Sequence, residues 1–123
     1  MNGGGWIGVD LDGTLAHYEE LNSIDHIGEP LMPMVNRVKA WLAEGHTVKI
    51  FTARVSGIGC LDLYTGTPLT EEHVLAPIRA WCKLHIGREL EITNVKDYSM
   101  IELWDDRAVQ VIPNTGEPLV PEK

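Results

Sequence analysis

The sequence lacks any long hydrophobic run, and no stretch approaches the roughly 18 apolar residues that a membrane-spanning helix needs. The N-terminal residues MNGGGW also lack the basic and then apolar layout of a secretory signal. Only two cysteines are present, Cys60 and Cys82, and they do not have the spacing of metal ligands. We therefore expect a cytoplasmic protein with free thiols that are buried or half-buried, and with no membrane partner.

Basic residues are also scarce. The chain has 10 Lys and Arg against 18 Asp and Glu, which gives a net charge of −8. This balance disfavours long-range attraction to nucleic-acid backbones and anionic membranes. Part of the acidity fits carboxylates gathered around a divalent cation. The 123 residues suit one domain, and no internal repeat or linker divides them. We expect a single domain over 1–123, with a flexible leader at 1–5 and a polar tail at 113–123.

Apolar periodicity predicts alternating strands and helices. One helix is expected over 33–44, with Pro33 in its first turn and Gly45 as its stop. A second helix ends near Gly87 and begins either after an N-cap at Thr70 or nearer Val74, because Pro77 disfavours a helix interior. Buried strands are expected over 6–9, 47–51, 91–95 and 101–104. Residues 109–112 could add a fifth strand, antiparallel at an edge, or form no strand. The pattern predicts an α/β fold with a mostly parallel sheet.

The most informative segment is I-G-V-D-L-D-G-T-L, residues 7–15. Asp10 and Asp12 stand at the carboxyl end of the first strand, where open α/β sheets place their ligands. On extended backbone the two carboxylates point to one side, and Leu11 between them points toward the core. Gly13 permits a tight turn there. An isolated D-x-D-G is also common in solvated turns, so other strand ends have to decide its meaning.

Polar residues follow each of the other expected strands. Thr52 ends the second strand, with Arg54 just behind it. Lys96 follows the third, and Asp105 and Asp106 follow the fourth. A hydroxyl, an ammonium group and two acidic pairs are what a phosphoryl-transfer site needs. Four converging carboxylates would repel one another without a cation, which predicts a Mg²⁺ site.

The order D-L-D-G-T, then Thr, then Lys, then D-D resembles the haloacid dehalogenase-like superfamily, specifically its aspartyl-phosphate phosphatases. The resemblance covers residues 6 to about 108 and implies a Rossmann-like three-layer sandwich without a cap domain. It implies that Asp10 is the nucleophile and Asp12 the general acid and base. It also implies that Thr52 and Lys96 orient phosphate, and that Mg²⁺ is held by Asp10, the carbonyl of Asp12 and an acid of the last pair. Asp106 aligns best with that last ligand, and Asp105 is the alternative. For Arg54, contact with phosphate and an ion pair with a nearby carboxylate both remain open.

Two features depart from the family's pattern. Only residues 97–104 separate Lys96 from the acidic pair, where relatives often have a full helix. Residues 15–32 and 55–69 give loops rather than the inserted lid of larger relatives. A bare site implies a large substrate or a lid from a neighbouring subunit, so a homo-oligomer is one expectation. The substrate is expected to be a phosphorylated small molecule, and a nucleic-acid phosphate end is the alternative.

Two other classes of function use similar residues. A signalling receiver domain has its acidic pair on the first strand and its lone acceptor on a middle strand, which is the reverse of the order here. A catalytically silent scaffold could keep the acids for metal-dependent stability. Near the first motif, His17 and Tyr18 are further candidates for substrate contact.

Overall fold

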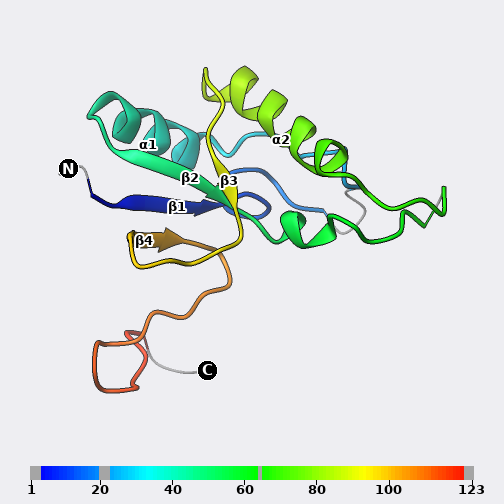
Figure 1. The fold of residues 1–123 in the computed structure, drawn as a ribbon. Helices are drawn as coiled ribbons and strands as arrows, with labels where there is room; N and C mark the ends of the chain where they lie inside the picture. The colour runs from blue at the N-terminus through cyan, green and yellow to red at the C-terminus, as the bar shows by residue number, and fades with distance from the viewer. Residues whose placement is uncertain (1–3, 20–22, 64, 121–123) are drawn as a thin grey trace.

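The computed structural model describes residues 4–19, 23–63 and 65–120 (Figure 1). Residues 1–3 of the expected leader therefore lie outside the described part of the chain. Four parallel strands form one sheet in the order β3-β2-β1-β4. Their bounds are Trp6–Asp10 for β1, Thr47–Phe51 for β2, Ile92–Thr93 for β3 and Met100–Trp104 for β4. The α/β fold and its parallel sheet are thus confirmed, and the carboxyl ends of all four strands meet at one edge.

The first helix, α1, spans Met32–Ala43 and follows the sequence prediction closely. Pro33 lies in its first turn, where the missing N–H has no helical partner to lose. Just beyond its end, Gly45 adopts a φ of +90°, which glycine tolerates far better than other residues. A short 3₁₀ helix, η1, spans Ala53–Gly57 after β2.

The second helix, α2, spans Glu71–His85 and begins directly after Thr70. The Thr70 hydroxyl accepts from the His73 N–H at 3.1 Å, and the His73 Nδ1 accepts from the Thr70 N–H at 3.2 Å. This reciprocal cap confirms Thr70 as the N-cap, and the alternative start nearer Val74 is wrong. Pro77 lies inside the helix. The buried side chains of Ile78 and Trp81 hold the helix against the core and offset the backbone bond that Pro77 removes.

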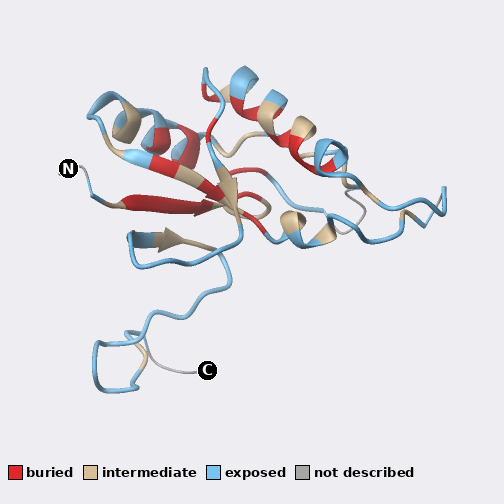
Figure 2. Ribbon diagram, viewed as in Figure 1, coloured by how far each residue is buried: buried red, intermediate tan, exposed pale blue. Residues whose placement is uncertain are grey.

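Both helices cover one face of the sheet (Figure 2). The core on that face combines Ile7 and Val9 of β1 with Ile50 of β2 and with buried residues of α1 and α2. This arrangement follows from right-handed crossovers, because the steps β1–β2 and β2–β3 both run toward the same edge of the sheet. Residues on this face alternate with residues on the other face, as a buried parallel sheet requires.

The opposite face of the sheet is covered thinly. The connection from β3 to β4, residues 94–99, crosses this face (Figure 1). The Trp6 indole N–H donates to Asp97 Oδ1 of this connection at 2.8 Å. This segment contains no helix. The fold therefore has the topology of a Rossmann-like three-layer domain without a cap, with its third layer reduced to residues 94–99. β3 itself is shorter than the expected 91–95, and the Thr93 hydroxyl accepts from the Val95 N–H as the chain turns away.

Residues 109–112 do not add a strand to the sheet, so of the two alternatives left open by the sequence the fifth strand is wrong and the absence of a strand is confirmed. They pair instead with the chain that follows them, through an antiparallel bridge between Val111 and Pro118. Only Arg107 and Ala108 separate them from Asp106, too few residues for a crossover back to the sheet. Asn114 and Gly116, with φ of 65° and 77°, reverse the chain. We call residues 108–120 the C-terminal arm.

Two further expectations concern the thiols and the membrane. Cys60 and Cys82 are both free, as expected; Cys82 is buried, but Cys60 is exposed, so the expected burial is wrong for Cys60. Across the described residues, neither helix has the length and apolar character required to cross a bilayer.

Candidate functional site

The turn after β1 is built to bring chain segments close together. Leu11 is fully buried, and its carbonyl accepts from the N–H groups of Leu15 and Ala16. Gly13 has a φ of +92°, and a Cβ at this position would lie 2.5 Å from Asp106 Oδ2. Gly13 is therefore required twice, once by its backbone conformation and once by the approach of Asp106. The turn places the end of β4 directly beside the end of β1.

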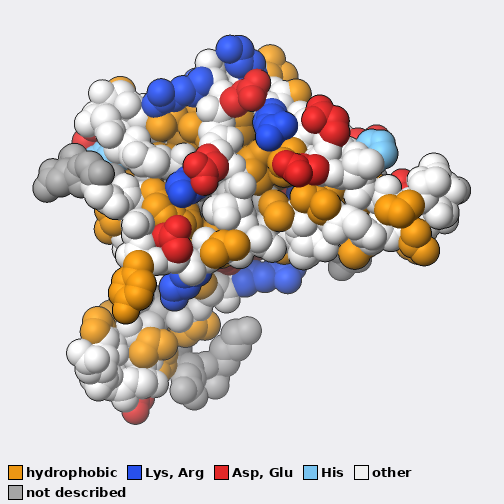
Figure 3. Space-filling view, in the orientation of Figure 1, with side chains coloured by type: hydrophobic (Ala, Val, Ile, Leu, Met, Phe, Trp, Pro, Cys, Tyr) orange, Lys and Arg blue, Asp and Glu red, His pale blue; other side chains and the backbone are white. Residues whose placement is uncertain are grey.

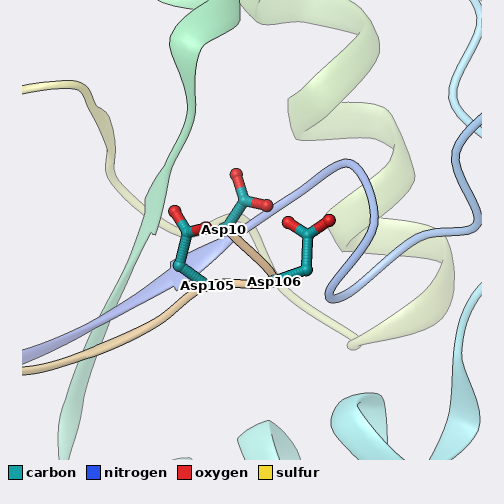
Figure 4. Close-up of side chains that lie close together, drawn as sticks. All are labelled: Asp10, Asp105 and Asp106. Carbon is teal, nitrogen blue, oxygen red and sulfur yellow. The ribbon is translucent and has the colours of Figure 1, made fainter. Parts of the chain in front are cut away.

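Three carboxylates converge at this place. Asp10, Asp105 and Asp106 each offer an oxygen, and these oxygens all lie within 4.8 Å of one another (Figure 4). The Thr14 hydroxyl donates to Asp10 Oδ2 at 3.3 Å, and Asp106 Oδ1 lies 3.5 Å from the same hydroxyl. Asp105 Oδ1 accepts from the Arg107 N–H at 2.7 Å. Both acids of the last pair thus reach the cluster, and the choice between them remains open.

The cluster changes the ionisation of Asp10. Burial raises the pKa of Asp10 to about 7, and the hydrogen bond with Asp106 and the charges of Asp105 and Asp106 act in the same direction. The Thr14 hydroxyl opposes this rise only weakly. Carboxylates held this close repel one another unless they share a proton or a cation. Oxygen ligands on carboxylates are those that Mg²⁺ prefers, so the donor set fits that ion.

Asp12 points to a different partner, Arg54. The Arg54 Nε donates to Asp12 Oδ2 at 2.7 Å and Nη2 donates to Oδ1 at 2.9 Å, in a bidentate ion pair. The side chains of Arg54 and Asp12 are only 10% and 19% exposed. The remaining donors of Arg54 reach three carbonyls of the loop that follows the first motif, those of Ser23, Ile24 and His26.

All five N–H groups of the Arg54 guanidinium are therefore engaged. Of the two interpretations left open by the sequence, the structure shows the ion pair. Arg54 ties Asp12 to residues 23–26 and has no donor to spare for phosphate while these bonds last. The sequence placed Arg54 correctly near the site, but its contacts depend on the path of a loop that has no periodicity.

Thr52 and Asn94 follow adjacent strands at the same edge of the sheet. Thr52 is 2% exposed, its N–H donates to the Thr93 carbonyl, and its hydroxyl accepts from the Arg54 N–H at 3.2 Å. Asn94 is the first residue after β3. Both line a cavity of about 490 Å³ together with Asp10 and Asp12. This volume lies in the range of small-molecule sites.

Several other residues line the same cavity, and sequence reasoning missed Ser56, Asn94 and Arg107. The lining also includes Tyr18, Ser56, Asp105, Asp106 and Arg107. Tyr18 had been expected as a candidate for substrate contact, whereas His17 lines a different hollow. For Asn94, the available signal was its place directly after a strand. For Arg107, it was its place next to the acidic pair.

Lys96 does not line this cavity. It lines a neighbouring hollow along β4, and Asp105 borders both spaces. The phosphate-binding role expected for Lys96 thus remains a prediction that its position does not yet support. Lys96 lies away from Asp10 because residues 94–99 form a short connection. The chain has to cross the sheet directly after β3, which leaves little freedom to direct Lys96 toward Asp10.

Comparison with known proteins supports the fold. No protein-family model and no curated protein sequence matches this chain. Among solved structures, a conserved protein from Bacteroides thetaiotaomicron is similar with a TM-score of 0.55 and 22% sequence identity, over 88% of this chain and 80% of that one. At this identity the likeness concerns the fold alone. The chain therefore shares with that protein the fold of a small α/β domain. The aspartate cluster at the carboxyl edge of the sheet is described for this chain alone.

Proposed function

We propose that this chain is a Mg²⁺-dependent phosphatase of the haloacid dehalogenase-like type that hydrolyses a small phosphomonoester through an aspartyl-phosphate on Asp10. The observation that carries the proposal is the convergence of Asp10, Asp105 and Asp106 at the carboxyl edge of a parallel sheet, beside the pair of Asp12 and Arg54. Phosphoryl transfer needs a nucleophile, a cation site and a proton carrier, and these residues supply each of them.

The donor set fits the ion. Asp10, Asp106 and Asp105 would hold Mg²⁺ through carboxylate oxygens, and the backbone carbonyl of Asp12 would complete the protein ligands. When bound, Mg²⁺ supplies positive charge that neutralises phosphate oxygens. Burial is the main cause of the raised pKa of Asp10. Ionisation of Asp10 is therefore unfavourable in the metal-free protein, and a bound cation would favour it.

Asp10 is the nucleophile in this proposal. One of its carboxylate oxygens forms a bond to phosphorus, and the ester oxygen leaves with the electrons of the broken bond. Water then attacks the phosphorus of the aspartyl-phosphate, which releases inorganic phosphate and restores the carboxylate of Asp10. Asp10 suits this role because its side chain lines the cavity at the end of a buried strand.

Asp12 is the proton carrier, and Arg54 positions it. The bidentate pair holds both carboxylate oxygens of Asp12 on the guanidinium of Arg54. Transfer of a proton to or from Asp12 therefore requires at least one of these two bonds to loosen.

The remaining cavity residues supply phosphate and substrate contacts. Thr52 and Asn94 offer a hydroxyl and an amide, and Arg107 offers a cation at the cavity wall. Lys96 would have to turn from its neighbouring hollow to take part. A cavity of about 490 Å³ accommodates a small phosphorylated metabolite, and the net charge of −8 disfavours a nucleic-acid end.

The test is hydrolysis of p-nitrophenyl phosphate by the purified chain, with Mg²⁺ and with excess EDTA. We expect turnover that needs Mg²⁺ and that Asp10→Asn abolishes. Full turnover in EDTA would contradict the assignment of the acids as a cation site. Stabilisation by Mg²⁺ without any turnover, on this substrate and on a panel of phosphorylated metabolites and phosphate-ended oligonucleotides, would instead favour a silent metal-binding scaffold.

A further inference from the structure

The C-terminal arm leaves the body of the protein soon after the acidic pair. It is held together by its own hydrogen bonds, from the Ile112 N–H to the Glu117 carbonyl and from the Leu119 N–H to the Gln110 carbonyl, both at 2.8 Å. Figure 1 shows the arm projecting away from the sheet and both helices. The arm is thus an ordered excursion of the chain that the body does not cover.

The arm is also apolar. Five of its side chains are between 40% and 68% exposed, namely Val109, Val111, Ile112, Leu119 and Val120. Figure 2 shows the arm almost entirely exposed, and Figure 3 shows hydrophobic side chains on its visible face. Glu117 is the single charged residue between positions 108 and 120. A contiguous apolar patch of this kind marks an interaction surface more often than a solvated tail.

A groove with both apolar and charged side chains runs along β4. β4 is the last strand of the sheet, and no strand of the described chain pairs with its outer edge. A hollow of about 610 Å³ lies along it, lined by the apolar residues Ile101, Leu103, Trp104 and Ala108 and by the polar residues Lys96, Glu102, Asp105 and Gln110. Ile101 is 54% exposed. An open strand edge beside a partly apolar groove is a ready template for another extended segment.

We propose that the C-terminal arm of one copy of this chain docks along β4 of a second copy, and that the exchange is reciprocal. The reciprocal contact is self-complementary, as a two-fold dimer requires. Each copy would contribute its arm and the β4 groove, which approaches the roughly 20–30 residues a side of a standard interface. An arm with one charged residue adds little repulsion between two chains that each carry −8.

The arm of the same chain is poorly placed to fill this groove. Ala108 and Gln110, at the base of the arm, already form part of the groove wall. The link from β4 to the arm consists of residues 105–107, and it is fastened at Asp105, which accepts from the Arg107 N–H and belongs to the acid cluster. The arm stays beside its own β4 as far as Gln110 and then projects away from the sheet, so a second copy can supply the missing segment (Figure 1).

The first experiment is sedimentation equilibrium on the full chain, and it needs no catalytic turnover. We expect a dimer at micromolar concentration, and Val111→Asp should raise its dissociation constant by about 100-fold or more, because it places a charge in an apolar contact. Leu63→Asp is the matched control, since Leu63 is 96% exposed on a loop far from the arm in sequence. It should leave the dimer unchanged. A monomeric wild-type chain, or equal weakening by both variants, would overturn the proposal.

A second experiment separates exchange from folding back. In a Cys60→Ser background, Ile101→Cys and Val111→Cys are combined and treated with a short bis-maleimide cross-linker. Cys82 is buried and should not react. Docking on a second copy predicts a cross-linked species of twice the chain mass. Cross-linking only within one chain would show that the arm covers its own β4 and would overturn the proposal. Neither result bears on the proposed phosphatase activity, which is tested separately by turnover.

Discussion

The ion pair between Arg54 and Asp12 should carry a large share of the stability of this small domain. Arg54→Met keeps most of the length of the side chain and removes all five donors. It leaves the carboxylate of Asp12, 19% exposed, without its partner. Breaking a buried pair costs about 3–5 kcal/mol, and the lower end applies here because both groups keep some contact with water. The carbonyls of Ser23 and His26 can recover water, so they add little.

A loss of about 3 kcal/mol converts to a clear change in melting temperature. The unfolding entropy of a domain of 123 residues is about 0.26 kcal/mol/K, so the expected decrease in Tm is about 12 °C. The measurement is thermal denaturation in EDTA, so that metal binding does not enter. Arg88→Met is the matched control, because Arg88 is exposed after α2, and its Tm should change by less than about 2 °C.

A double-mutant cycle decides whether the pair itself is responsible. Asp12→Asn, Arg54→Met and the double variant should show a coupling free energy above about 1.5 kcal/mol, since each single change leaves the other group unpaired. A coupling near zero, or a decrease in Tm no larger than that of the Arg88 control, would refute the account of Arg54 given above.

Three further predictions concern the acid cluster and its turn. Asp12→Asn should keep the nucleophile and lower turnover by about 10²–10⁴-fold. With a substrate that has a good leaving group, aspartyl-phosphate should accumulate and increase the mass of the protein by 80 Da, the mass of HPO₃. Retained turnover would remove Asp12 from the mechanism. Folding raises the pKa of Asp10 from 3.8 to about 7. At a pH between these two pKa values the folded metal-free protein therefore binds more protons than the unfolded chain, so its free energy of unfolding should fall as pH rises from about 4 to 7. Asp10→Asn should abolish this loss in EDTA, an effect of about 1–2 kcal/mol after solvent screening, and an unchanged pH profile would contradict it. Gly13→Ala should weaken the activation of turnover by Mg²⁺ because its Cβ would displace Asp106, whereas Gly45→Ala, with similar φ and no atom within 4 Å, should cost stability alone.

The sequence predicted the elements whose residues repeat regularly. The burial of Val9 and Ile50 and the cap at Thr70 follow from local patterns, so β1, β2 and both helices could be placed. The meeting of Asp10 with the last acidic pair could also be anticipated, because parallel strands end at one edge. These inferences need only periodicity and topology.

Features that depend on irregular segments could not be predicted in this way. The five bonds of Arg54 require the carbonyls of residues 23–26 to point inward, and no periodic signal encodes that path. The direction of Lys96 depends on how residues 94–99 cross the sheet. The pairing of Val111 with Pro118 rather than with β4 depends on the short link after Asp106 and on the turn at Asn114 and Gly116.

The pairing of β1 with β4 also has a consequence for the order in which the protein can fold. Trp6 pairs with Met100 and Val9 with Trp104, so the two strands that carry the acid cluster come from opposite ends of the chain. Contacts of such large sequence separation require closure of a long loop and form slowly. During synthesis, β1 and β2 can pair long before β4 has been made. The acid cluster is thus among the last features to assemble, and under the proposed function Mg²⁺ binding would report that the whole domain, rather than its first half, has reached its final structure.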